Sequence, residues 1–306
     1  MTTVELRQLR YFVAVAEELN FGRAAARLLI AGPSLSQQIK ALERDLGVPL
    51  FHRDRRSVSL TTEGSALLPD AQALLDQADA FQHRARGFSG SQSLTIAYVS
   101  WLPPDLGPRT SNAAQVHIDP WVAPSHVQAA RVADGSLDLA VCWVGSSDLE
   151  KLGLRAALVG VDRLHAVSSR KDMGDVAAKD TVLLLHDDTT WLSWNAYAKQ
   201  MSRATGARLS QVSHSSLTGQ AFFDHVRHSR RPVINNPKSQ TAPLPQDLIR
   251  RTVVSPEIYW TWSLVWRRDD DRAEVRAVVE ALCRNSEDLG IHGQAAWLPD
   301  DDPHRR

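Results

Sequence analysis

A turn between two helical segments lies at the centre of residues 21–61, FGRAAARLLIAGPSLSQQIKALERDLGVPLFHRDRRSVSLT. Ala31-Gly32-Pro33 is a turn signal, and a proline fits the first turn of the helix that follows it. The apolar residues of that helix recur at steps of four, three and four, at Leu35, Ile39, Leu42 and Leu46. Gly47 stands where a helix commonly ends. Residues 6–19 and 21–28 carry two earlier helical patterns, so the sequence predicts three helices with a turn before the third.

The segment after the third helix predicts a short β-hairpin with a basic tip. Val58 and Leu60 alternate with polar residues, which is typical of a strand. The tip holds a group of basic residues with one acidic residue among them: His52, Arg53, Asp54, Arg55 and Arg56. Three helices followed by such a hairpin form a winged helix-turn-helix, which we place at residues 1–61.

The polar face of the third helix is a candidate DNA-contacting surface. Gln pairs with adenine through two hydrogen bonds, and Lys and Arg reach phosphates or guanine. Arginines beside a tight turn suit phosphates or a narrow minor groove. The candidate DNA-binding residues are Arg23, Pro33, Ser34, Ser36, Gln37, Lys40, Arg44, Arg53, Arg55 and Arg56. The alternative interpretation is a basic but merely solvated surface, and the stacked order of the elements favours DNA.

A long helix is predicted at residues 62–88, with apolar residues in a heptad pattern. The seam consists of Leu67, Ala71, Leu74, Ala78, Phe81, Ala85 and Phe88. So narrow a seam on so long a helix favours pairing with a second copy, so we expect self-association through residues 62–88. Pro69 removes one hydrogen bond and should bend the helix early. Residues 88–93 are expected to be a flexible linker.

Strand and helix patterns alternate from about residue 93 to residue 295, which predicts an α/β domain with a largely parallel sheet. The predicted strands are 94–99, 116–121, 137–143, 158–167, 182–186, 211–214, 232–234 and 262–266. The predicted helices are 125–134, 194–205, 218–228 and 272–283. The acidic stretch within residues 296–306 is expected to be a disordered tail.

The N-terminal motif resembles that of LysR-type transcriptional regulators. The resemblance is carried by Leu9, Phe12, Val15-Ala16, Phe21, Ala24-Ala25, Leu28, Pro33-Ser34-Leu35-Ser36, Ile39, Leu42-Glu43, Leu46-Gly47, Leu50-Phe51, Arg53, Arg56, Leu60-Thr61 and Gly64. Further on, 94–97 and 135–141 are similar to two strands of the family's effector domain. The resemblance implies a winged helix-turn-helix with a long dimerising linker helix, followed by an α/β two-lobed effector domain like that of type 2 periplasmic binding proteins.

This resemblance implies a ligand-responsive transcription regulator that binds double-stranded promoter DNA as a dimer or tetramer. We place lobe I at about 93–160 and 265–295, and lobe II at about 161–264. Three departures stand out. Ala31-Gly32 replaces the family's common Ser-Gln, the segment between Val99 and Val116 is short, and His225–Arg231 replaces a Gly-rich segment. The first departure favours the rival interpretation, an interaction or ligand-binding module whose helix-turn-helix has lost DNA specificity.

Polar and aromatic residues at the predicted strand ends are candidates for binding a small-molecule effector, because ligands bind beyond the carboxyl ends of strands in open α/β sheets. They are Ser100, Trp101, Ser125, His126, Trp143, His214, Ser215 and Asn235. The resemblance places effector-contacting hydroxyls at Ser100 and Ser125. A helix start favours an anion, so a carboxylate or an aromatic compound is expected. Core packing for the Trp residues, and plain solvation for the His residues, are the alternatives.

Composition excludes several other classes of protein. The chain of 306 residues is 43% hydrophobic and 23% charged, with zero net charge and two cysteines, which fits an ordinary globular protein in a reducing compartment. No apolar run approaches membrane-spanning length, and MTTVELRQLR lacks a signal pattern, so a cytoplasmic protein without membrane contact is expected. His225 and His228 lack a third ligand nearby, and no catalytic motif occurs, so we expect no metal, no cofactor and no enzymatic activity.

Overall fold

The computed structural model divides into two compact units, Met1–Ser89 and Gly90–Arg306. It describes residues 4–28, 30–53, 58–88, 93–169, 173–187, 189–212, 218–237, 243–284 and 290–305. Among these residues no helix is both long enough and apolar enough to cross a membrane.

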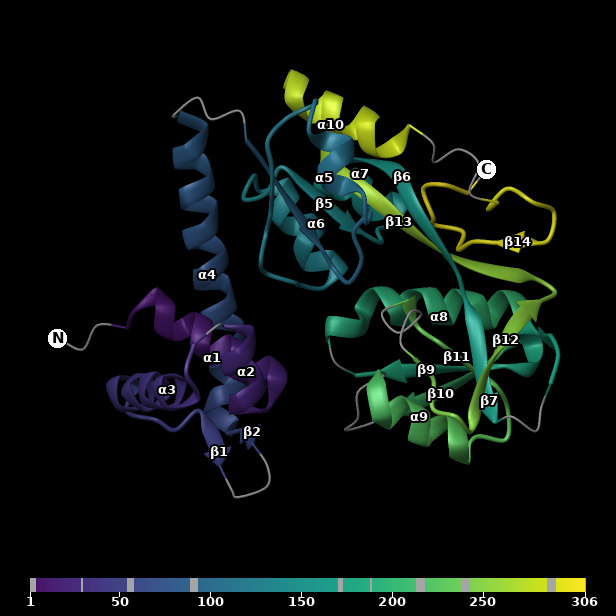
Figure 1. Ribbon diagram of the computed structural model, residues 1–306, viewed down its shortest axis with the longest axis horizontal. Helices are drawn as coiled ribbons and strands as arrows, with labels where there is room; N and C mark the ends of the chain where they lie inside the picture. Colours follow the sequence, from purple (N-terminus) through teal and green to yellow (C-terminus); the bar gives the residue numbers. More distant parts are fainter. Residues whose placement is uncertain are drawn as a thin grey trace. The chain divides into compact units, whose positions relative to one another are not determined.

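The first unit is a winged helix-turn-helix followed by a long helix, as predicted (Figure 1). Its elements are α1 (Leu6–Glu18), α2 (Phe21–Arg27), α3 (Gly32–Leu46), β1 (Phe51–Arg53), β2 (Val58–Leu60) and α4 (Thr62–Phe88). Strands β1 and β2 pair antiparallel, with Phe51 opposite Leu60. Helix α3 begins after Ala31 with a proline in its first turn, and it ends at Gly47 with a φ of 74°, a left-handed conformation that suits glycine.

The core of the first unit forms where the apolar stripes of its helices meet. Leu35, Ile39 and Leu42 of α3 are fully buried, and Phe12 of α1 packs edge to face on Phe51 at 5.6 Å between ring centroids. Each fully buried side chain of this size contributes about 1.5–3 kcal/mol relative to an exposed one. The packing therefore fixes which face of α3 points away from the core.

Thr61 joins the β-hairpin to the start of α4. Its hydroxyl accepts the amide of Gly64 at 2.8 Å, which caps the helix, and donates to the carbonyl of Pro49 at 2.7 Å. Its own amide donates to the carbonyl of Leu50 at 3.0 Å. The backbone of Gly64 lies so close that an added Cβ would stand 2.2 Å from the Leu50 oxygen. A glycine is therefore required at this contact.

The first sheet of the second unit has the strand order β14-β13-β5-β3-β4, and β6 pairs with β13 beside this path. Its strands are β3 (Leu94–Tyr98), β4 (Val116–Ile118), β5 (Leu139–Cys142), β6 (Leu154–Arg163), β13 (Glu257–Arg267) and β14 (Ala296–Trp297). Its helices are α5 (Leu106–Thr110), α6 (Ser125–Ala133), α7 (Ser146–Leu152) and α10 (Ala273–Cys283). In Figure 1, α5 and α10 lie on one side of this sheet and α6 on the other.

The second sheet has the order β10-β9-β11-β7-β12-β8. Its strands are β7 (His165–Ser169), β8 (Val176–Ala177), β9 (Val182–His186), β10 (Arg208–Val212), β11 (Val233–Ile234) and β12 (Leu248–Val254). Helices α8 (Leu192–Thr205) and α9 (Gly219–His228) cover its two faces, and short 3₁₀ turns lie at Ala178–Asp180 and Thr189–Trp191 (Figure 1). Each sheet with its helices forms one lobe of the second unit, which gives the α/β two-lobed arrangement that the resemblance implies.

Two features of the second unit differ from the sequence-based expectation. The chain passes between the sheets near Leu164 and again at Ser255-Pro256, rather than near residues 160 and 265, because β13 pairs with β6 from Tyr259 to Arg267. Both sheets mix parallel and antiparallel pairs. In the first sheet β3 pairs parallel and β13 antiparallel with β5, and in the second β10 pairs parallel with β9 and β11 antiparallel with β7. Helix α5 has only five residues and lies in the short segment between Val99 and Val116.

The predicted disordered tail is wrong for residues 296–305. Strand β14 pairs with the start of β13, and Leu298 and Asp302 are 4% and 3% exposed. The acidic composition indicated solvation, but hydrogen-bond donors far away in the sequence satisfy the carboxylate of Asp302. This segment is therefore an ordered part of the second unit.

Candidate nucleic-acid interface and interlobe site

The outward face of α3 carries most of the predicted DNA contacts. Pro33, Ser34, Gln37, Lys40 and Arg44 are exposed along it, and Ser36 is half-buried. Because Leu35, Ile39 and Leu42 of the same helix are buried in the core, this polar face is held outward. A helix with free amide, ammonium and guanidinium groups on one exposed face has the donors and acceptors needed to contact base edges and phosphates.

Arg23 lies at the start of α2 and is already engaged. Its side chain forms an ion pair with Glu18 at 3.1 Å and also donates to the Glu18 carbonyl oxygen. The Asn20 side chain accepts the Arg23 amide at 3.0 Å and so caps α2. A DNA contact by Arg23 would therefore compete with an exposed ion pair, which contributes little stability.

The first two residues of the predicted basic tip lie on β1, the strand that follows α3. His52 is exposed on β1, and Arg53 is the last residue of that strand. Arg55 and Arg56 lie outside the described residues. Their proposed phosphate contacts therefore stay predictions.

Glu43 has a structural role beside the candidate DNA surface that the sequence analysis did not predict. Its carboxylate accepts the backbone amides of Leu50 and Phe51 at 3.0 and 3.2 Å. These two hydrogen bonds fix the start of β1 to the middle of α3, and charged acceptors make such bonds strong. The spacing Leu42-Glu43 to Leu50-Phe51 was visible in the sequence, but only the fold brings the carboxylate to these amides.

The predicted effector contacts of the first lobe gather at the ends of β3 and β5. Ser100 is exposed after β3, and the buried hydroxyl of Ser125, at the start of α6, accepts the amide of Trp143 at 3.3 Å. His126 is exposed, and partial burial of its ring lowers its pKa below the ordinary value. The sheet end therefore holds hydroxyl and imidazole groups close to an aromatic side chain.

In the second lobe, the structure describes only Asn235 of the predicted contacts. It follows β11, is 1% exposed, and donates its amide to the carbonyl of His165 at 2.9 Å. His214 and Ser215 lie outside the described residues. That Asn235, His214 and Ser215 form one effector site with the residues of the first lobe stays a prediction.

Aromatic side chains from both lobes pack into one cluster, which the sequence did not reveal as a unit. Trp143 packs on Trp260 at 5.4 Å, and Trp260 in turn contacts Trp194 and Tyr197 of α8 at 6.2 and 5.2 Å. Trp260 is a residue of β13 in the first lobe, so the cluster crosses from one lobe to the other. The Trp143 side chain is 6% exposed and packs among these aromatic residues, which is the alternative interpretation of this residue.

Trp101 also packs within this region. Its ring stacks on Trp262 at 6.0 Å and lies against Gly160, where an added Cβ would collide with the indole. The indole nitrogen of Trp262 donates to Asp162 at 2.8 Å, and burial raises the pKa of that carboxyl group despite this bond. Half-exposed Trp101 thus forms an aromatic wall at the end of β3.

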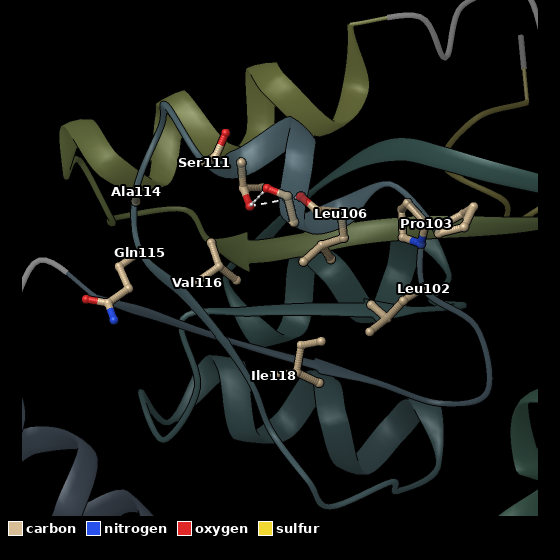
Figure 2. A pocket seen from close by; sticks show the side chains of 11 residues that line it. Leu102, Pro103, Leu106, Ser111, Ala114, Gln115, Val116 and Ile118 are labelled. Atoms are coloured by element: carbon tan, nitrogen blue, oxygen red, sulfur yellow. Dashed lines mark hydrogen bonds between the residues drawn. The ribbon is translucent and has the colours of Figure 1, made fainter.

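A surface groove of about 540 Å³ lies elsewhere on the first lobe, beside α5 and β4. Figure 2 shows Leu102, Pro103, Leu106, Val116 and Ile118 around it, and none of the predicted effector contacts lines it. Helix α5 is short, and Ile118 on the edge strand β4 is 51% exposed. The groove is thus distinct from the strand ends where the candidate contacts gather.

The thiols and imidazoles outside these regions offer little chemistry. Burial raises the pKa of Cys142 to about 12 and that of Cys283 to about 11, which disfavours the reactive thiolate. On α9, His228 contacts the backbone oxygen of Asp224 at 2.7 Å. The described part of the chain contains no group of three His, Cys, Asp or Glu residues arranged to hold a metal ion.

The buried core, the outward polar face of α3 and the adjoining hairpin define a winged helix-turn-helix protein. The family model of "Bacterial regulatory helix-turn-helix protein, lysR family" matches residues 6–65. Residues 6–65 of this chain are therefore similar to the helix-turn-helix proteins of the lysR family, as the sequence resemblance predicted.

Two curated relatives from Escherichia coli K12 resemble part of the chain. The Hca operon transcriptional activator HcaR is 50% identical over 107 residues, which is 35% of this chain and 36% of the relative. The uncharacterized regulator YnfL is 41% identical over 144 residues, which is 44% of this chain and 48% of the relative. The matches thus span less than half the length of either relative.

Among solved structures, full-length CbnR complexed with its target DNA covers 92% of this chain and 99% of its own, at 21% identity and a TM-score of 0.49. The assignment of the fold rests on the strand orders and helices described above.

Proposed function

We propose that this chain is a sequence-specific DNA-binding transcription regulator that responds to a small-molecule effector and acts as a dimer or tetramer on promoter DNA in the cytoplasm. It needs no enzymatic activity and no cofactor for this role. The observation that carries the proposal is the exposed polar face of α3 within a helix-turn-helix domain similar to those of the lysR family. In this motif the second helix of the pair enters the major groove with its N-terminal residues on base edges.

The contacts divide into two kinds that experiments separate. Gln37, exposed near the start of α3, suits base recognition, and Arg53 and Arg56 of the wing suit phosphates. A base contact discriminates between sequences by about 1–3 kcal/mol, whereas each phosphate contact adds about 0.9 to the slope of log affinity against log salt.

The test is a gel shift with DNA from upstream of the chain's own coding region, with unrelated DNA as competitor. Gln37→Ala should weaken binding only to sites that carry the matching base pair. Arg56→Ala should weaken binding to all sequences and reduce the salt slope. Lys199→Ala, an exposed cation on α8 of the second unit, serves as the control and should leave both quantities unchanged.

If unrelated competitor DNA abolishes binding to every promoter tested, the proposal is overturned and the interaction-module interpretation is favoured. Equal losses on all sequences for Gln37→Ala would instead remove that residue from base recognition. The two outcomes are distinguishable in the same titration.

Self-association is proposed to use α4. Leu74 and Phe81 lie seven residues apart on this helix and are 50% and 68% exposed in the single chain. Apolar side chains at this spacing on one helix face match the seam of a two-helix coiled coil. Leu74→Ser with Phe81→Ser should shift the protein toward monomer in sedimentation velocity, whereas Gln77→Ala on the same helix should not. A double variant that stays fully associated would contradict this interface.

The effector is proposed to bind at the strand ends of the second unit, near Ser100, Ser125 and Trp101. Hydroxyls and a helix start beside an aromatic wall favour a carboxylate or an aromatic compound. Because all nine Trp residues follow residue 100, their fluorescence reports binding to this unit. A titration with simple aromatic carboxylates is expected to change the emission in the wild type and not in Ser100→Ala with Ser125→Ala. A response that survives in the double variant would place the ligand elsewhere.

A further inference from the structure

The segment from Trp297 to Arg305 contacts both lobes of the second unit. On the first lobe, Asp301 is held at the start of α7. Its carbonyl accepts the amide of Ser146 at 2.7 Å, and its carboxylate accepts the amide and hydroxyl of Ser147 at 3.0 and 2.9 Å. A side chain at Gly145 would collide with this carboxylate, so the contact is closely packed. One end of the segment is thus anchored in the first lobe.

The other anchor lies on α8 of the second lobe. The amide of Asp300 donates to the side-chain oxygen of Gln200 at 3.0 Å. The ring of Trp297, whose backbone belongs to β14 in the first-lobe sheet, packs edge to face against Tyr197 of α8 at 5.4 Å. Tyr197 is fully buried and donates its hydroxyl to the carbonyl of Tyr259 at 2.7 Å, so this end of the segment rests on a rigid part of the lobe interface.

Between the anchors and the end of the segment, two polar side chains are embedded against β13. The carboxylate of Asp302, 3% exposed, accepts the Thr261 hydroxyl at 2.7 Å and the His304 amide at 2.9 Å. The His304 ring contacts the buried hydroxyl of Ser263 through Nε2 at 2.8 Å. Transfer of a carboxylate out of water is costly unless hydrogen bonds replace the lost hydration. The Thr261 hydroxyl of β13 and the His304 amide of the segment itself thus hold the Asp302 side chain against the sheet.

We propose that residues Trp297–Arg305 form a strap that ties the two lobes together, with Asp302 held against β13 by the Thr261 hydroxyl. The strap is short: Asp300, whose amide bonds to α8 of the second lobe, directly precedes Asp301, which bonds to the start of α7 in the first lobe. Lobes joined in this way separate only as far as the strap allows while both anchors hold. A larger opening requires one anchor to break, so anchor strength sets the range of lobe motion.

The strap concerns the second unit alone and does not depend on DNA binding. A segment that merely covers the surface of one lobe would leave the separation of the lobes unchanged when its contacts are weakened. A strap predicts that weakening either end, on different lobes, has the same effect on the same distance. This difference is the basis of the test.

The experiment measures the distance between the lobes in the full chain with two nitroxide labels. Lys151→Cys on α7, whose native side chain is 72% exposed, and Arg208→Cys at the start of β10, also exposed, provide the label sites in a Cys283→Ser background. Pulsed electron paramagnetic resonance then gives the distance distribution. Asp301→Ala removes the carboxylate anchor on the first lobe, and Gln200→Ala removes the side-chain anchor on the second.

Each anchor variant should broaden the distribution toward longer distances. Amide hydrogen exchange of residues 298–305 should accelerate about threefold to tenfold, the effect of one lost hydrogen bond. Lys199→Ala, next to Gln200 on α8, and Asp271→Asn, an exposed carboxylate before α10, are the controls and should change neither quantity.

If both anchor variants speed up amide hydrogen exchange of the segment but leave the distance distribution between the lobes unchanged, the strap proposal is wrong. The segment would then cover the surface without limiting lobe motion. Unprotected exchange of residues 298–305 in the wild type would overturn it as well. If Asp301→Ala does not fold, Ser147→Ala takes its place, since it removes only one exposed hydroxyl from the same anchor.

Discussion

Replacing Gly64 with Ala should destabilise the first unit selectively. The added methyl group would lie 2.2 Å from the carbonyl oxygen of Leu50, where an ordinary carbon–oxygen contact is at least about 3.3 Å. The two segments must therefore separate by about 1 Å, which breaks the 3.0 Å bond from the Thr61 amide to that carbonyl. A lost bond that leaves a buried acceptor costs about 1–3 kcal/mol, and overpacking adds about 1–3 kcal/mol.

Greater helix propensity of alanine returns about 1 kcal/mol, so the net loss is about 1–5 kcal/mol, centred on about 3 kcal/mol. In a unit of this size such a loss lowers the Tm by roughly 10–20 °C. Thermal unfolding followed by far-UV circular dichroism should show this shift in the helix-rich first unit. Tryptophan fluorescence should not move, because every Trp lies in the second unit.

Gly32→Ala is the matched control, since no atom lies within 4 Å of the position of its added Cβ. It should leave the first transition unchanged or raise it slightly. Equal shifts for Gly64→Ala and Gly32→Ala, or no shift for Gly64→Ala, would refute the argument from close backbone contact.

Three further changes test other contacts. Burial lowers the pKa of His304 to about 4, so the unfolded chain takes up its proton first as the pH falls from about 6.5. The stability of the folded chain therefore does not suffer from His304 above pH 6.5 and falls as the pH drops toward 4, by about 1–2 kcal/mol near pH 5. Urea unfolding followed by Trp fluorescence should show that His304→Gln loses less stability in acid than the wild type. Equal losses in the two proteins would contradict this expectation. Arg131 forms a buried ion pair with Asp119 at 2.6 Å, so Asp119→Ala should cost about 3–5 kcal/mol in the same assay, and a loss below about 1 kcal/mol would show that the pair is replaceable. Gly32→Gln should add a side chain at the start of α3 and strengthen binding to some promoter sequences in a gel shift, whereas uniform binding would place position 32 away from the bases.

The local patterns of the first unit were sufficient to predict its fold. Leu35, Ile39 and Leu42 lie at helical spacing, and the same spacing decides which polar residues face outward, so the core and the candidate DNA surface follow from one periodicity. Glu43 was missed because its partners, the amides of Leu50 and Phe51, are backbone groups that every sequence supplies. Only the path of the chain around Gly47 shows that its carboxylate reaches them.

The second unit was predicted less completely, because its contacts join distant segments. The strand of predicted residues 262–266 extends back to Glu257, since pairing with β6 continues to Tyr259 and pairing with β14 adds Glu257 and Ile258. Asp302 bonds to Thr261, 41 residues away, so an acidic and locally hydrophilic stretch is ordered by partners that its own sequence does not reveal. Strands β8, β12 and β14 and helix α7 escaped notice for similar reasons: they are short or polar and gain stability mainly from neighbours in the fold.

The cap at Thr61 has a mechanical consequence. Because this residue bonds to Pro49, Leu50 and Gly64, the hairpin and the first turn of α4 move as one rigid piece. The 27 residues of α4 make a lever of about 40 Å, and a tilt of about 5° displaces one end relative to the other by about 3.5 Å, close to the rise of one base pair. A small angular change at the far end of this helix thus shifts the wing by one step along a duplex, without any change inside the helix-turn-helix itself.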